Sequence, residues 1–347
     1  MRNIYIVLML LVLSSCADYL EQDSGELNTL DKIFTSEVDT KKWYSRMYSD
    51  DFMVQEMHYS SQIPYFWCTD EAAYVMESTV RNISEGLMSP DNYYGYTGYN
   101  LYFFVRYYQA IRHINIFIEN LDRCIEMGEL ERRTKYAEAI FMRAYYHYLL
   151  LRLYGPIPIV ESSRDGNEIL VPQARKPFVE CVQWISDQID WACENGMPQK
   201  RNESIELGLP TVGAARAIQS RMYLMAASPL YNGNSVYSNW KNKDGAALMP
   251  ANYDKELWKV AAKDVIDNYG YSLKQPKAKS GEPTFDEVVE NIRTITTTWG
   301  ENENPELIWG HPNTIQWYAR CAVPARWYGW NGRYSLPLGM INDFFMA

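Results

Sequence analysis

The chain has 347 residues, of which 47% are hydrophobic and 22% are charged, so it is long enough to bury a sizeable globular core. Its net charge of −10 argues against nucleic-acid binding, which depends on clustered Lys and Arg. The histidines His58, His113, His147 and His311 are scattered and form no HExxH pattern, so the sequence predicts neither a transition-metal site nor a cofactor.

The first residues predict a secretory signal of the kind that precedes lipid attachment. The basic start Met1-Arg2-Asn3 is followed by an apolar stretch, Ile4 to Leu13, and then by Cys16. The stretch is too short to span a bilayer, which takes about 20 residues. We therefore predict a lipoprotein signal peptide over residues 1–15, acylation of Cys16, and an acidic tether over residues 16–30. An ordinary signal peptide that happens to end at a cysteine is the alternative.

Apolar residues at helical spacing predict two neighbouring helices in the middle of the chain. The first stripe consists of Tyr107, Ile111, Ile114, Ile118 and Leu121, and the second of Ala137, Phe141, Ala144, Tyr148 and Leu151. The short turn at Met127-Gly128 predicts that the two helices pack antiparallel. Gly155-Pro156 should end the second helix, because glycine suits a left-handed cap and proline cannot continue a helix.

Three more helices are predicted after this pair. One opens at Pro177 and ends at Asn195-Gly196. Another begins after Pro210, with Thr211 as its N-cap, and a further one runs from about Asp254 to Tyr269.

Paired amphipathic helices in series are typical of a tetratricopeptide-like array, although the period here is irregular. The predicted fold class is therefore all-α, with a helical array over about residues 99–270 and a loop-rich, aromatic part over residues 271–347. Short strands are predicted at Ile157–Val160, Tyr271–Leu273 and Leu307–Trp309.

Several segments, taken in order, resemble one known family. The string from Glu138 to Pro158, EAIFMRAYYHYLLLRLYGPIP, is similar to the helix and turn that mark SusD/RagB proteins, the outer-membrane nutrient-binding lipoproteins of Bacteroidetes. Further segments that resemble the family are Asp70-Glu71, Tyr108–Asn115, Pro172–Glu180, Ala214–Ala227 and Ala261–Leu273. The resemblance implies one SusD-like domain over residues 31–347. Members continue beyond the segment that Tyr334 to Phe345 resembles, so we expect the chain to be C-terminally incomplete.

The resemblance implies binding rather than catalysis. Members capture oligosaccharides at the cell surface, or peptides in the RagB-like branch, and deliver them to a SusC-like, TonB-dependent transporter. The expected location is the outer membrane, through the lipid on Cys16, with the domain facing the cell exterior. A helical-repeat scaffold that binds another protein is a further alternative.

A glycoside hydrolase is the enzyme alternative, because that chemistry needs two carboxylates beside the sugar. Glu301, Glu303 and Glu306 lie near Trp299 and Trp309 in the sequence. Residues 304–308, NPELI, resemble a structural segment of the family, so we predict that the protein is not an enzyme.

Two loop regions combine flat rings with polar side chains, which is the composition that suits sugars. The candidate ligand-binding residues of the first region are Trp67, Asp70, Arg81, Asn92, Tyr94 and Tyr96. Those of the second region are Trp317, Trp327, Tyr328 and Trp330. The alternative is that these rings pack into the core. Asp70 and Glu71 would then cap a short helix over Ala72–Met76.

Polar residues inside the predicted helices have a structural interpretation. Asn115 and His147 are predicted to be buried and hydrogen-bonded. Arg143 and Arg152 are predicted to pair with acidic residues of neighbouring helices rather than with a ligand.

Overall fold

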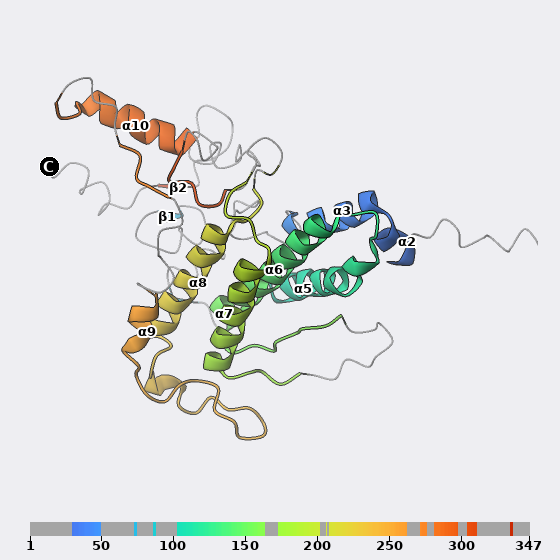
Figure 1. Cartoon of the computed structure of the whole chain (residues 1–347). Coiled ribbons are helices and arrows are strands. Elements are labelled where there is room, and N and C mark those ends of the chain that lie inside the picture. Colours follow the sequence, from blue (N-terminus) through green and yellow to red (C-terminus); the bar gives the residue numbers. More distant parts are fainter. Residues whose placement is uncertain are drawn as a thin grey trace, which may run out of the picture.

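The structure is a computed structural model, shown whole in Figure 1. It describes residues 30–49, 73–74, 86–87, 103–163, 173–201, 206, 208–261, 271–275, 281–297, 304–310 and 334–335. The predicted signal peptide and Cys16 lie outside these residues, as does the predicted tether up to residue 29. Those assignments stay predictions.

Helices account for most of the described structure. They are α2 (Leu30–Thr35), α3 (Glu37–Ser45), α5 (Phe103–Asn120), α6 (Glu129–Tyr154), α7 (Phe178–Asn195), α8 (Val212–Ala227), α9 (Glu256–Lys259) and α10 (Phe285–Thr297). Three 3₁₀ turns, η2 (Arg46–Tyr48), η4 (Leu121–Arg123) and η5 (Ser235–Tyr237), lie between them. Two short strands, β1 (Ala73–Tyr74) and β2 (Tyr334–Ser335), complete the described elements.

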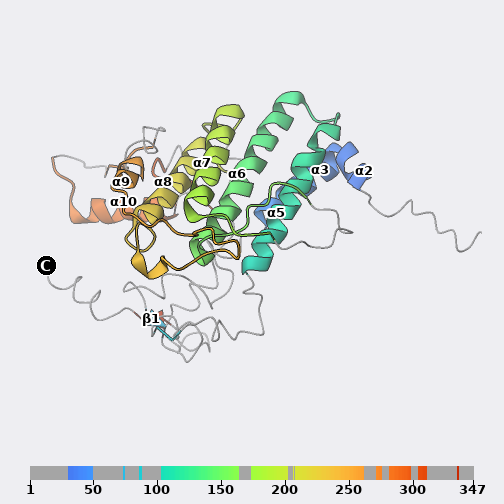
Figure 2. The same cartoon turned by 90° about the horizontal axis from the view of Figure 1, so that it is seen from below.

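The helices α5, α6, α7 and α8 lie side by side in chain order (Figure 2). Each contacts the next one, and α3 covers part of α5. Every helix of this row thus buries a face against its sequence neighbours, which is how helical repeat arrays build a continuous core. The predicted all-α fold class is confirmed.

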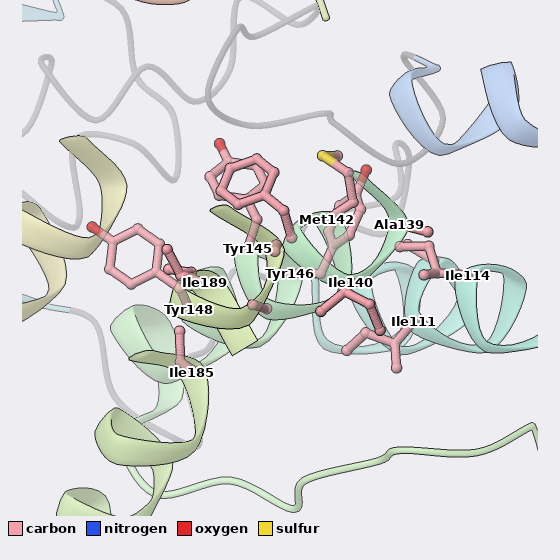
Figure 3. Close-up of a cluster of buried hydrophobic side chains, with 14 of the residues drawn as sticks. Ile111, Ile114, Ala139, Ile140, Met142, Tyr145, Tyr146, Tyr148, Ile185 and Ile189 are labelled. Atoms are coloured by element: carbon pink, nitrogen blue, oxygen red, sulfur yellow. The ribbon is translucent and has the colours of Figure 1, made fainter. Parts of the chain in front are cut away.

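Helix α6 is the centre of the core. Each residue from Ala137 to Leu151 is buried, so this helix is covered on all sides rather than on one stripe. Figure 3 shows Ile111 and Ile114 of α5 on one side of it, and Ile185 and Ile189 of α7 on the other. Burial of a large apolar side chain stabilises a fold by about 1.5–3 kcal/mol, so α6 supplies much of the hydrophobic stabilisation.

The helix ends follow the local signals in the sequence. The N–H of Gly155 donates to Leu151 O and its φ is 69°, so α6 stops where it was predicted to stop. Gly196, with φ 149°, ends α7. At the start of α8, the Thr211 hydroxyl accepts from the N–H of Ala214, which confirms the predicted N-cap.

The three predicted strands are wrong, because none of these segments is extended against a partner strand. Ile157 O accepts from Lys176 N at 2.9 Å, and side chains bind the backbone of Pro158 and Val160. The His147 Nε2 accepts from Val160 N at 3.1 Å, Tyr108 OH donates to Pro158 O at 2.7 Å, and Asn115 Nδ2 donates to Val160 O at 3.3 Å. Backbone N–H and C=O groups that bond to side chains do not need the hydrogen bonds of a neighbouring strand.

The chain between α8 and α9, residues 228–255, forms a long excursion that is drawn in yellow to orange in Figure 1. Asn232 is buried and joins its two ends, because its amide donates to Asp254 O at 2.7 Å and its Oδ1 accepts from Asp254 N at 2.8 Å. Next to it, Gly233 has φ 73°, and a Cβ at this position would lie 2.4 Å from Tyr253 N. Glycine is therefore required twice over, for its conformation and for the close backbone approach.

We expect Gly233→Ala to lower the free energy of unfolding by about 3 kcal/mol, since it adds a backbone clash to the left-handed strain of about 1–2 kcal/mol. Gly245→Ala is the matched control, because Gly245 has φ 90° but a Cβ added to it would meet nothing within 4 Å. Urea unfolding of both variants measures the difference. Equal losses would contradict the requirement for close approach at Gly233.

Candidate functional site

The ten candidate ligand-binding residues all lie outside the described residues. They are Trp67, Asp70, Arg81, Asn92, Tyr94, Tyr96, Trp317, Trp327, Tyr328 and Trp330. The structure therefore leaves their predicted role open. It does describe short stretches beside them, and these stretches show how the two predicted regions are related.

The strands β1 and β2 join the two regions. They pair antiparallel, with Ala73 opposite Ser335 and Tyr74 opposite Tyr334. Strand β1 follows Asp70 by three residues, and β2 follows Trp330 by four. Segments about 260 residues apart in sequence thus meet at one two-stranded sheet. Ala73 and Tyr74 are strand residues, so the alternative helix over Ala72–Met76 is wrong there.

Residues 304–310, next to the second region, are fixed on the helical array. The Trp309 indole donates to Gly208 O at 2.8 Å, and its ring packs edge-on against Phe141 and Tyr145 of α6. Asn304 is buried and donates to Ile295 O of α10 at 2.8 Å. These contacts hold Trp309 on α6 and Asn304 on α10.

Glu306, one of the three carboxylates of the enzyme alternative, has a structural partner. Its Oε1 accepts from Lys274 N at 2.8 Å, and its own N–H donates to Asn304 Oδ1 at 3.3 Å. Glu306 thus has a structural role in joining residues 274 and 304. Glu301 and Glu303 lie outside the described residues.

The buried polar residues of α5 and α6 hold the segment after α6 in place. Asn115 and His147 are fully buried and hydrogen-bonded, as predicted, and both bond to Val160. The Nδ1 of His147 lies 2.8 Å from Arg143 O, so it carries the proton and Nε2 is left as the acceptor. Burial lowers the pKa of His147 to about 3, so the ring stays neutral.

The predicted pairing of Arg143 with an acidic side chain is wrong in the described structure. Its Nη1 donates to Asn115 Oδ1 at 3.1 Å and to Glu161 O at 3.0 Å, and its Nη2 donates to Gln188 Oε1 at 2.5 Å. The guanidinium thus binds neutral oxygens, which are the side-chain amides of α5 and α7 and a backbone carbonyl of the segment after α6. The guanidinium of Arg152 lies over the Tyr148 ring, 5.8 Å from its centre.

The sequence interpretation missed a group of exposed rings on and after the excursion. Trp240, Tyr253 and Trp258 are 43%, 59% and 39% exposed. The turn-forming residues Ser228-Pro229 and Asn232-Gly233 mark this stretch as irregular, and that signal was available in the sequence. It did not show which rings would be buried.

The described ranges hold neither a membrane span nor a cluster of metal ligands. Among the helices that they contain, none combines the length and apolar composition of a membrane span. Within the same ranges, no three His, Cys, Asp or Glu side chains converge as metal ligands would.

Comparison with known proteins gives consistent matches. A SusD-like protein of Bacteroides ovatus is 27% identical over 150 residues, which are 42% of this chain and 23% of that protein. The solved structure named BT4246 is 26% identical and superposes with a TM-score of 0.62 over 82% of this chain and 52% of its own. A SusD-like protein from Bacteroides fragilis, 19% identical, gives a TM-score of 0.52 over 84% of this chain and 46% of its own, and this likeness shows the fold.

The chain thus spans about half the length of these solved structures. The SusD-like family, described as "Starch-binding associating with outer membrane", matches residues 18–224, which is more than half of the chain. The central helices α5, α6 and α7, and most of α8, fall inside that match. The chain therefore belongs to the SusD-like family.

Proposed function

We propose that the protein is a cell-surface lipoprotein that binds oligosaccharide nutrients and delivers them to a SusC-like, TonB-dependent transporter. The single observation that carries this proposal is membership of a family described as starch-binding and associated with the outer membrane. The acidic, non-basic composition agrees with a sugar ligand and not with nucleic acid.

The β1–β2 pair supports a ligand site made from both aromatic regions. Paired residues of an antiparallel sheet lie about 5 Å apart. Chain connectivity then keeps Trp330 within about 14 Å of Tyr334, and Asp70 within about 11 Å of Ala73. Rings and carboxylates from segments far apart in sequence are thereby available to one ligand, and this is how a sugar with apolar faces and polar edges is bound.

The membrane part of the proposal rests on the N-terminal sequence. We propose that Cys16 is acylated and that residues 16–30 tether the domain to the outer membrane, with the domain facing the cell exterior. Each buried methylene contributes about 0.8 kcal/mol, so two or three acyl chains hold firmly. Mass spectrometry of the cell-derived protein tests this, because an unmodified Cys16 would remove the anchor.

The proposed role is binding without catalysis, in agreement with a family described as starch-binding. Incubation of the purified protein with polysaccharide tests this point. Release of shorter sugars by the protein alone would instead support the glycoside hydrolase.

Calorimetry with oligosaccharides tests the ligand site directly. We expect Trp327→Ala and Tyr96→Ala each to weaken binding by about tenfold, since one aromatic contact is worth about 0.5–1.5 kcal/mol. The melting temperature should stay unchanged, because rings that contact a ligand are not part of the core.

The matched control is Trp191→Ala on α7, a ring that is 40% exposed and packs edge-on against Tyr136. This variant should bind as the wild type does. A fall in melting temperature for Trp327→Ala and Tyr96→Ala would place both rings in the core. If the wild type bound peptides but not sugars, the ligand would be a peptide, as in the RagB-like branch.

A further inference from the structure

Two exposed rings meet where the excursion joins α9. Tyr253 is 59% exposed and Trp258 is 39% exposed. A single exposed ring needs no explanation, but two rings held together on one surface do. Both views show α9 apart from the β1–β2 pair (Figures 1 and 2).

The two rings meet through their polar tips. The Trp258 indole N–H donates to the Tyr253 hydroxyl at 3.1 Å. Among the described residues, neither ring stacks against a further ring. This bond joins the edges of the two rings and leaves their flat faces out of the contact. Flat aromatic faces are the part of Tyr and Trp that contacts the C–H face of a sugar.

Polar groups for sugar hydroxyls adjoin the rings. The Tyr253 oxygen accepts from the indole, so its own proton is left to donate outward. Asp254 is exposed, and its Oδ1 accepts from Glu256 N at 2.9 Å. Its carboxylate keeps a second oxygen that can accept from a hydroxyl. Stacking faces with a donor and an acceptor beside them are the elements of a sugar-binding surface.

The backbone under these groups is fixed before any ligand arrives. Asn232 bonds to both the N–H and the C=O of Asp254, and the chain at Gly233 lies directly against Tyr253 N. A surface that is held in place loses little conformational entropy on binding. The excursion thus holds the backbone of Tyr253 and Asp254 in place beside α9.

We infer that Tyr253, Asp254 and Trp258 form a second carbohydrate-contact surface, the excursion platform, which stacks one sugar ring of a long polysaccharide. The inference rests on the proposed function, because it takes the ligand class from there. A polysaccharide that engages two surfaces of one chain gains affinity through effective concentration, whereas a short oligosaccharide occupies one surface at a time.

Electrophoresis in native gels that contain soluble starch, a β-1,3-glucan, xylan or mannan tests the platform. We expect Trp258→Ala and Tyr253→Ala to lower the apparent affinity for the polysaccharide that retards the wild type most by about tenfold. Tyr253→Phe keeps the ring but removes the hydroxyl, so it should give a smaller loss. Calorimetric binding of a short oligosaccharide at the other site should not change.

Trp191→Ala is again the matched control, since its exposure of 40% is close to the 39% of Trp258. Melting temperatures verify that all variants are folded. Unchanged retardation of Trp258→Ala and Tyr253→Ala, or an equal loss for Trp191→Ala, overturns the platform and leaves the proposed function standing. Absence of both retardation and calorimetric binding for the wild type overturns the two proposals together.

Discussion

Arg201→Met is expected to lower the free energy of unfolding by about 3–5 kcal/mol, because it leaves a carboxylate buried without its cation. Glu138 of α6 is 1% exposed and Arg201 is 8% exposed, and the guanidinium donates to Glu138 Oε1 and to Pro210 O. Tyr44 of α3 donates to the other oxygen of Glu138. Burial, with Tyr48 and Glu138 nearby, raises the pKa of Tyr44 well above its ordinary value, so that hydroxyl keeps its proton.

Urea unfolding with matched variants measures the effect. Lys259→Met removes a cation from the exposed pair with Glu256, whose side chains are 72% and 52% exposed, and should change stability by less than about 0.5 kcal/mol. The double variant Glu138→Gln with Arg201→Met should lose less than the sum of the two single variants, since neither charge is then left buried. Additive losses would show that the two groups do not act as a pair.

Much of the helical array could be predicted because its signals are local. Gly155-Pro156 and Thr211 act within one turn of the helix that they end or begin, and the structure places both ends as predicted. Helix α10 also has such a signal, which the loop-rich interpretation of residues 271–347 missed. Thr284 and Glu287 bond to each other's backbone N–H, which is the capping box readable as T-x-x-E.

The strands could not be predicted correctly, because whether a segment pairs as a strand depends on contacts with residues far away in the sequence. Residues 157–160 are apolar enough for a strand, but the backbone of Pro158 and Val160 bonds to side chains of α5 and α6. Strand β1 has two residues and exists through β2, which lies far away in the sequence. A local pattern contains no information about either kind of partner.

The aromatic residues show the same limit for the candidate site. Tyr231 and Tyr253 lie in the same excursion, yet Tyr231 stacks on Phe178 at 4.7 Å between ring centres whereas Tyr253 is exposed. Composition identified stretches that are rich in rings, and it could not separate rings that pack from rings that are free to bind. The three-dimensional arrangement makes that separation, and it adds Tyr253 and Trp258 to the candidates.

Mild acid is expected to destabilise the fold through two buried histidines. Burial is the main cause that lowers the pKa of His113 to about 4 and of His147 to about 3, and the nearby cations Arg46 and Arg143 contribute to these shifts. In the unfolded chain both titrate near pH 6.5. Below that pH the unfolded state binds protons that the folded state does not, so stability is complete above about pH 6.5 and falls as the pH drops toward 4 and then 3.

Each histidine should remove about 1.4 kcal/mol of stability between pH 7.5 and 5.5, since its unfolded form takes up a proton within that window, and the two together about 2.7 kcal/mol. The ordinary pKa values of Asp and Glu lie near 4, below this window. Urea unfolding at the two pH values measures the loss. His113→Gln should halve it, because the amide can still donate to Trp43 O, which the ring nitrogen contacts at 2.8 Å, but cannot take up a proton. If His113→Gln kept the full loss, the acid sensitivity would have to arise from groups other than this histidine.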